Sequence, residues 1–191
     1  MGTDVLTIMD SNLKDRISLK EKIENLNSIV FPLLSELIIL PEDAIWKWDY
    51  DPIFEGISFA EWIDSLGAGI TISEVLTISF FNDTISLTSP IRWHTFLTNK
   101  QVSSVWKNII STIANVFGST MAIYLPDQSW KPATNADNRI WEGVLFKEVR
   151  KKLHEEGESY NTLEEIHSLL DGYGYFEDIL RGISQLSGDR C

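Results

Sequence analysis

The sequence predicts an α+β fold, in which a single domain spanning residues 1–191 packs a small, mostly antiparallel sheet against several helices. Three observations indicate this class. Residues 75–81 and 84–88 alternate apolar and polar side chains around Asn82-Asp83, which is typical of a β-hairpin. Residues 102–117 instead place apolar side chains at steps of three and four, which indicates a helix with one buried face. Strands and helices do not alternate regularly along the chain, so a doubly wound parallel sheet is not expected.

The N-terminal half contains two signals for the start of a helix and one for a short strand. A capping box begins at Ser18 and another at Ser58, because a glutamate follows each serine three residues later. We therefore expect a helix after each serine, and the second should cover 59–66. Residues 37–40 form a short apolar run that stops at Pro41, which predicts a strand.

The middle of the chain is predicted to be its central packing unit. Residues 84–126 contain no acidic residue. Because ionised side chains are costly to bury, such a stretch is typical of buried structure. Gly118 is placed to end the 102–117 helix, and the apolar run at 121–125 predicts a buried strand after it.

The C-terminal third is predicted to be helical. An apolar stripe over 146–153 indicates one helix, and Thr162 with Glu165 forms a third capping box for a helix that continues to Leu170. Residues 176–180 are interpreted as one or two last helical turns. The segment 184–191 is expected to be a frayed tail.

Two segments, 35–75 and 120–166, share a series of landmarks. In each, an apolar run ends at a proline followed by an acid, then come a Trp-Lys pair, a Glu-Gly pair and a helix signal. One interpretation is a weak internal duplication. The other is that two unrelated connections use the same turn and capping chemistry, and the sequences diverge after the last threonine of each segment.

Charge and cysteine content narrow the class of protein. The chain carries 16 basic and 28 acidic residues, a formal net charge of −12, which argues against binding to nucleic acid. The apolar run at 29–40 is too short and too interrupted to span a membrane. Cys191 is the single cysteine, so no intrachain disulfide is possible, and the first residues lack the pattern of a secretory signal. These features predict a cytoplasmic protein that does not bind a membrane.

The motifs of common enzyme classes are absent from the sequence. The three histidines, His94, His154 and His167, lack the short spacing of metal ligands, and no nucleophile elbow or phosphate-binding glycine loop occurs. Asp49, Asp51 and the nearby acids lack the glycine turn of a calcium loop. We therefore assign no catalytic residue, no metal ligand and no cofactor from the sequence, and leave enzymatic activity open with a preference against it.

Aromatic residues interleaved with acids are the feature that points to a binding surface. The chain has seven tryptophans, and most of them lie outside the clearly predicted helices. One segment, 41–56, alternates aromatic and acidic residues, and a second aromatic loop is expected around 127–141. Buried aromatic anchors ringed by carboxylates suit the capture of a basic protein. The predicted partner-binding residues are Glu42, Asp43, Trp46, Trp48, Asp49, Tyr50, Asp51, Glu55, Trp130 and Trp141.

These properties favour a small, acidic, tryptophan-rich binding protein. The most specific hypothesis is an immunity-type inhibitor that occludes a basic partner, such as a bacterial toxin domain. One alternative is a small hydrolase or transferase that uses carboxylates or histidines of the C-terminal helices. Another is a scaffold subunit that uses its tryptophans for homo-oligomerisation. In a further interpretation, the same tryptophans hold long loops against the core and bind nothing.

Overall fold

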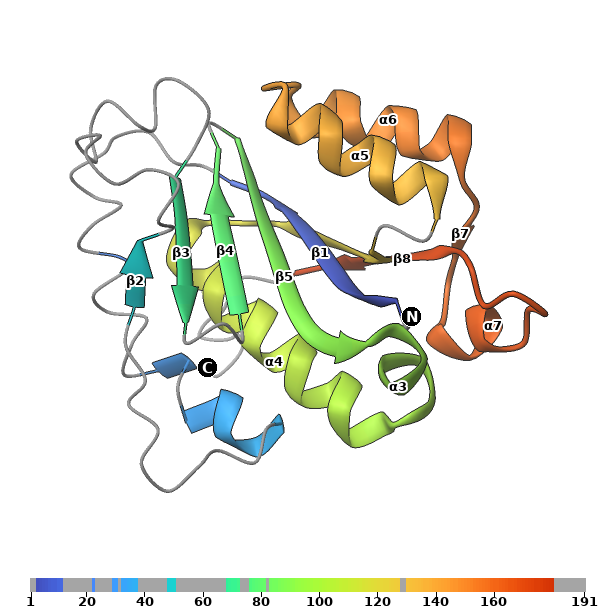
Figure 1. Ribbon diagram of the computed structural model, residues 1–191, viewed down its shortest axis with the longest axis horizontal. Helices are drawn as coiled ribbons and strands as arrows, with labels where there is room; N and C mark the ends of the chain where they lie inside the picture. The colour runs from blue at the N-terminus through green and yellow to red at the C-terminus, as the bar shows by residue number, and fades with distance from the viewer. Residues whose placement is uncertain are drawn as a thin grey trace, which may run out of the picture.

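The fold is α+β, as the sequence predicts (Figure 1). The computed structural model describes residues 3–11, 22, 29–30, 32–37, 48–50, 68–72, 76–81, 83–127 and 130–180, and of 48–50, 68–72 and Pro90 it describes the backbone alone. The strands are β1 (Asp4–Asp10), β2 (Trp48–Tyr50), β3 (Ala68–Ile72), β4 (Leu76–Phe80), β5 (Thr84–Arg92), β6 (Met121–Pro126), β7 (Ser159–Tyr160) and β8 (Tyr175–Ile179). The named helices are α3 (Trp93–Thr98), α4 (Lys100–Phe117), α5 (Lys131–Trp141), α6 (Phe146–Glu156) and α7 (Leu163–His167), and residues 32–37 are also helical.

The described strands form one eight-stranded sheet in the order β2-β3-β4-β5-β1-β6-β8-β7. Each neighbouring pair is antiparallel except β7 and β8, which run parallel. β1 lies inside this sheet and pairs with β5 on one side and β6 on the other. Segments far apart in the sequence therefore meet at β1, and the sheet is mixed but mostly antiparallel.

Strand β1 is buried on both faces. Val5 and Met9 belong to the apolar cluster formed with α3 and α4, whereas Leu6 and Ile8 belong to the cluster formed with α5 and α6. This two-sided burial follows from the alternation of side chains along a strand. Figure 1 shows α4 on one side of the strands and the pair α5 and α6 on the other. The sheet, with β1 inside it, is therefore the middle of three layers.

Helix α4 covers one face of the sheet with an apolar stripe. Asn99 caps its first turn by accepting backbone N–H groups, and Gly118 ends it in the left-handed conformation, at φ 71°. Near its middle, the indole N–H of Trp106 donates a 3.0 Å hydrogen bond to the hydroxyl of Thr7, and both residues are fully buried. Burial of each isoleucine or phenylalanine side chain in the stripe contributes about 1.5–3 kcal/mol. The buried residues of the stripe are Trp106, Ile109, Ile110, Ile113, Ala114 and Phe117.

Helices α5 and α6 pack together over the opposite face. An ion pair between Arg139 and Glu156 connects the two helices. The start of α6 is fixed by Asp83 in the β4–β5 turn, because both carboxylate oxygens accept the backbone N–H of Phe146, at 3.1 and 3.0 Å. A carboxylate at this position also complements the positive end of the helix dipole. The β4–β5 hairpin therefore positions α6.

Several predicted elements are confirmed. The hairpin is β4 with β5, the 102–117 helix is α4, the 121–125 strand is β6 and the 146–153 helix is α6. The third capping box opens α7, where the Thr162 hydroxyl accepts the backbone N–H of Glu165. That helix ends at His167, one turn earlier than expected.

Three expectations are wrong. Residues 176–180 are not helical, because Tyr175–Ile179 form β8, which pairs with β6. The second aromatic loop is instead largely helix α5, which begins next to Pro132 and buries a narrow stripe of small side chains. Leu37 was expected to begin a strand but ends a helical segment, since Val30, Leu34 and Leu37 follow helical spacing and all join the α4 cluster.

Other expectations fall largely outside the described residues. These are the helix after Ser18, of which Lys22 is described and helical, the 59–66 helix, residues 38–40 and the 184–191 tail. Most of the segment 35–75 is also undescribed, so the internal duplication stays a hypothesis. Among the described helices, none combines the length and hydropathy needed to cross a membrane.

We expect Thr7→Val to lower the free energy of unfolding by about 1–3 kcal/mol, because it leaves the buried indole N–H of Trp106 without an acceptor. Urea unfolding measures this loss. Thr112→Val is the matched control, since the Thr112 hydroxyl donates to Asn108 at the exposed side of α4. Equal losses in the two variants would show that the buried hydrogen bond is not important for stability.

Candidate functional site

The ten predicted partner-binding residues are distributed unequally in the structure. Five of them, Glu42, Asp43, Trp46, Asp51 and Glu55, lie outside the described residues. Trp48, Asp49 and Tyr50 form β2, an end strand of the described sheet, which pairs with β3. Trp130 and Trp141 are described with their side chains and lie at the two ends of α5.

Trp130 contacts the core and serves to join secondary-structure elements. It is the N-cap residue of α5 and is partly buried. A Cβ atom at Gly157, at the end of α6, would lie 2.6 Å from the Trp130 ring, so only glycine lets the indole pack this closely. The ring also lies 6.3 Å from that of Tyr175, measured between centroids. Its packing gives Trp130 a structural role whether or not it also contacts a partner.

Trp141 is more accessible. Its side chain is 37% exposed at the end of α5, and its ring packs edge-on against Phe81, with 5.2 Å between centroids. Leu145, in the connection to α6, is 55% exposed. Asp137 lies one helical turn before Trp141 and hydrogen-bonds to it, and Glu142 next to Trp141 is exposed. We call Asp137, Trp141, Glu142 and Leu145 the turn patch.

The surroundings of Asp137 in this patch disfavour its ionised form. Burial raises the pKa of Asp137, and the negative charge of Asp127 raises it further, while the hydrogen bond from Trp141 acts in the opposite direction. The environment of Asp137 therefore favours the protonated carboxyl group over the charged carboxylate, relative to water. A cation placed beside it would relieve that cost.

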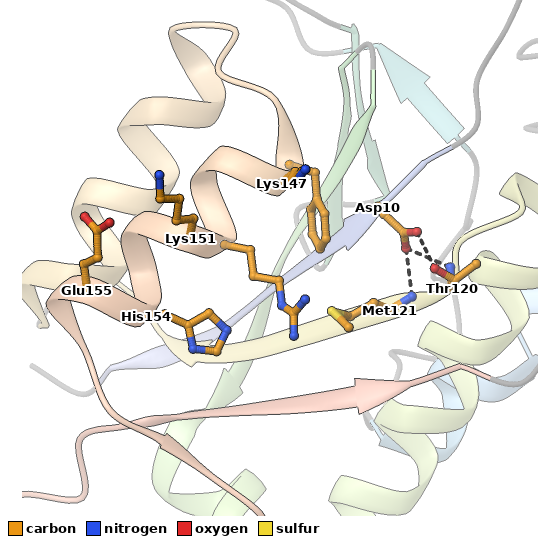
Figure 2. A pocket seen from close by; sticks show the side chains of 9 residues that line it. Asp10, Thr120, Met121, Lys147, Lys151, His154 and Glu155 are labelled. Atoms are coloured by element: carbon orange, nitrogen blue, oxygen red, sulfur yellow. Dashed lines mark hydrogen bonds between the residues drawn. The ribbon is translucent and has the colours of Figure 1, made fainter.

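A second site lies on the other side of α6. An open pocket of about 590 Å³ separates α6 from the ends of β1 and β6 (Figure 2). Figure 2 shows the α6 side chains on one side and Asp10, Thr120 and Met121 on the other. Its lining combines apolar, cationic and acidic groups: Asp10, Thr120, Met121, Phe146, Lys147, Arg150, Lys151, His154 and Glu155. We call this the α6 pocket.

Asp10 fixes the wall of the α6 pocket that faces the helix. One carboxylate oxygen accepts the backbone N–H groups of Thr120 and Met121, at 2.7 and 2.8 Å. The other oxygen accepts the Thr120 hydroxyl, at 2.6 Å. Because both oxygens are engaged, this acid holds the start of β6 against the end of β1.

His154 is part of a polar network beneath the pocket. Its Nδ1 lies 2.8 Å from the Tyr175 hydroxyl and its Nε2 lies 3.1 Å from Glu177. Burial raises the pKa of Tyr175 and the charge of Glu177 raises it further, whereas the hydrogen bond with Ser159 and the charge of Arg150 act in the opposite direction. Both imidazole nitrogens are engaged, so a role as general base would require one of these contacts to break.

Arg150 and Glu177 complete the network. The Nε and Nη2 groups of Arg150 donate to the two oxygens of Glu177, at 2.9 and 2.7 Å. This paired geometry is the strong form of an arginine–carboxylate contact. It fixes the guanidinium at the pocket while leaving the Nη1 hydrogens for another acceptor.

The remaining histidines lie together at the surface. The rings of His94 on α3 and His167 on α7 are 5.7 Å apart between centroids, and both residues are exposed. Within the described part of the chain, no group of three or more histidine, cysteine, aspartate or glutamate side chains is arranged to hold a metal ion.

Comparison with known proteins does not assign either site. No protein-family model matches the chain, and no curated protein or solved structure shows significant similarity to it. The turn patch and the α6 pocket are therefore interpreted from their own geometry.

Sequence reasoning missed the α6 pocket and Leu145. A signal for the pocket was present, because Lys147, Arg150, Lys151 and His154 follow the i, i+3, i+4, i+7 spacing of one helix face. Their opposing wall could not be foreseen, since Asp10 and Thr120 come from distant elements. Leu145 carried no signal, because isolated exposed apolar residues are common.

We expect Asp137→Asn to stabilise the protein at pH 7. A folded-state pKa raised above the unfolded value means that the carboxyl contributes most to stability at low pH and that this contribution is lost as pH rises. Asparagine keeps an acceptor for Trp141 without the charge. The advantage in urea unfolding should therefore shrink toward zero near pH ~3. An advantage that grows on acidification would contradict the raised pKa.

Proposed function

We propose that the protein is an acidic binding protein of the immunity type, which occludes a basic protein partner such as a bacterial toxin domain. The turn patch is the observation that carries this proposal. It combines an exposed indole, an exposed leucine and two acids at the end of α5 and in the connection to α6. Aromatic and apolar anchors surrounded by charge are the usual composition of an interface hot spot.

The electrostatics of Asp137 favour a basic partner over a neutral one. Asp127 disfavours ionisation of Asp137, so a lysine or arginine brought to this surface would gain attraction from both acids. The net charge of −12 adds a long-range field that speeds the approach of a cationic protein. Replacing Trp141 would remove the anchor, whereas added salt would weaken the field.

The rigidity of the turn patch also suits binding. Trp141 is held by Phe81 and by Asp137, while the Arg139–Glu156 pair and the Asp83 cap position the two helices. A surface already ordered in the free protein loses less conformational entropy when a partner binds. Residues 41–56, with the remaining predicted contacts, are proposed to extend the same interface.

We expect immobilised protein to capture one basic protein stoichiometrically from its native lysate at low salt, with less captured at high salt. Once the partner is identified, Leu145→Ala should weaken binding by about tenfold, which corresponds to about 1.4 kcal/mol. Surface plasmon resonance with the purified partner measures the change.

Leu170→Ala is the matched control, because Leu170 is also an exposed leucine but lies after α7, away from the turn patch. Its affinity should equal that of the unmodified protein. Equal weakening by Leu145→Ala and Leu170→Ala, or salt-insensitive capture, would count against the turn patch as the binding surface. The combined alanine variant of Trp46, Trp48, Asp49 and Asp51 tests the 41–56 segment in the same way.

A further inference from the structure

Helix α6 concentrates positive charge in an acidic protein. The chain as a whole has a net charge of −12, whereas the eleven residues of α6 carry a net charge of +1, because three glutamates stand against four basic residues: Lys147, Arg150, Lys151 and Lys152. Three of these four, without Lys152, line the α6 pocket. The pocket is therefore a cationic site on a molecule whose average field repels anions.

The cations in the pocket are incompletely neutralised. Lys152 forms a 2.7 Å ion pair with Glu155, the acid at that end of the pocket, and the charge of Lys151 also stabilises this carboxylate. Arg150 pairs with Glu177 but keeps its Nη1 hydrogens, and the pair holds the guanidinium in place. Lys147 and Lys151 make no ion pair with any described residue. Two ammonium groups and a fixed guanidinium edge are thus available to an anion.

The acid on the opposite wall, Asp10, already has most of its hydrogen-bonding capacity engaged. Both oxygens of Asp10 already accept hydrogen bonds from Thr120 and Met121. The lining also includes apolar surface from Met121 and Phe146. The α6 pocket therefore offers a cationic rim for a charged group and an apolar wall for an organic group.

We propose that the α6 pocket binds a phosphomonoester, with its phosphoryl oxygens at Lys147, Arg150 and Lys151 and its organic part against Met121 and Phe146. A phosphoryl group matches this rim because it presents three terminal oxygens to three cationic donors, whereas a carboxylate presents two. Lys147 and Lys151 are one helical turn apart, about 6 Å between Cβ atoms, so both reach one dianion. This site is separate from the turn patch and does not depend on the proposed protein partner.

The test is a calorimetric titration of the full chain with phenyl phosphate at constant ionic strength. We expect saturable binding, weakened about tenfold or more in the Lys147→Gln/Lys151→Gln double variant. Benzoate should bind about tenfold more weakly than phenyl phosphate, because it lacks the third oxygen and second charge. Inorganic phosphate should also bind more weakly, since it gains nothing from the apolar wall.

The Lys100→Gln/Lys131→Gln double variant is the control, because it also removes two positive charges, but from exposed residues that do not line the pocket. Its affinity should stay within about twofold of the unmodified protein. A loss of affinity equal to that of the Lys147→Gln/Lys151→Gln variant would show that general electrostatic attraction, and not the pocket, accounts for binding. Benzoate binding as tight as phenyl phosphate, or no saturation up to on the order of 10 mM, would overturn the proposal. Circular dichroism of each variant verifies that its helices are intact.

Discussion

The burial of β1 between two helical layers is the constraint on which the other elements depend. One face of the strand requires α4, whose Trp106 satisfies the buried hydroxyl of Thr7, and the other requires α5 and α6. A strand with apolar side chains on both faces is stable only when both layers are present. The two candidate sites both lie on the α5–α6 layer, so their geometry depends on the same burial.

The α5–α6 pair carries surfaces of opposite character. The turn patch is acidic and aromatic, whereas the α6 pocket has a cationic rim. The two surfaces share no residue, although Leu145 of the turn patch directly precedes Phe146 of the pocket lining. Asp83 holds Phe146, the first residue of α6, next to the turn patch, and Glu177 holds Arg150 in the middle of the helix, beneath the pocket. A single helical hairpin thus presents two chemically distinct surfaces without metal ligands or disulfides in the described residues.

Local signals allowed much of the fold to be predicted, and long-range contacts explain the rest. The α4 stripe and the β4–β5 hairpin depend on neighbours in the sequence, so their periodicity was sufficient. β1 was not foreseen because burial on both faces removes the alternation that marks a strand. Phe176 and Ile179 have the three-residue spacing of a helix, but pairing with β6 decides their conformation. Of the candidate site, Trp141 was predicted from composition, whereas the α6 pocket joins α6 to Asp10 and Thr120, which no local pattern connects.

The position of β1 has a consequence for how the protein is made. Asp10 pairs with Thr84, Asp4 with Arg92 and Met9 with Ala122, so a strand synthesised early finds its partners only after the middle of the chain has left the ribosome. Until then, its apolar side chains and unpaired backbone are exposed on the nascent chain. Native pairing of β1 must therefore follow release of β5 and β6 from the ribosome.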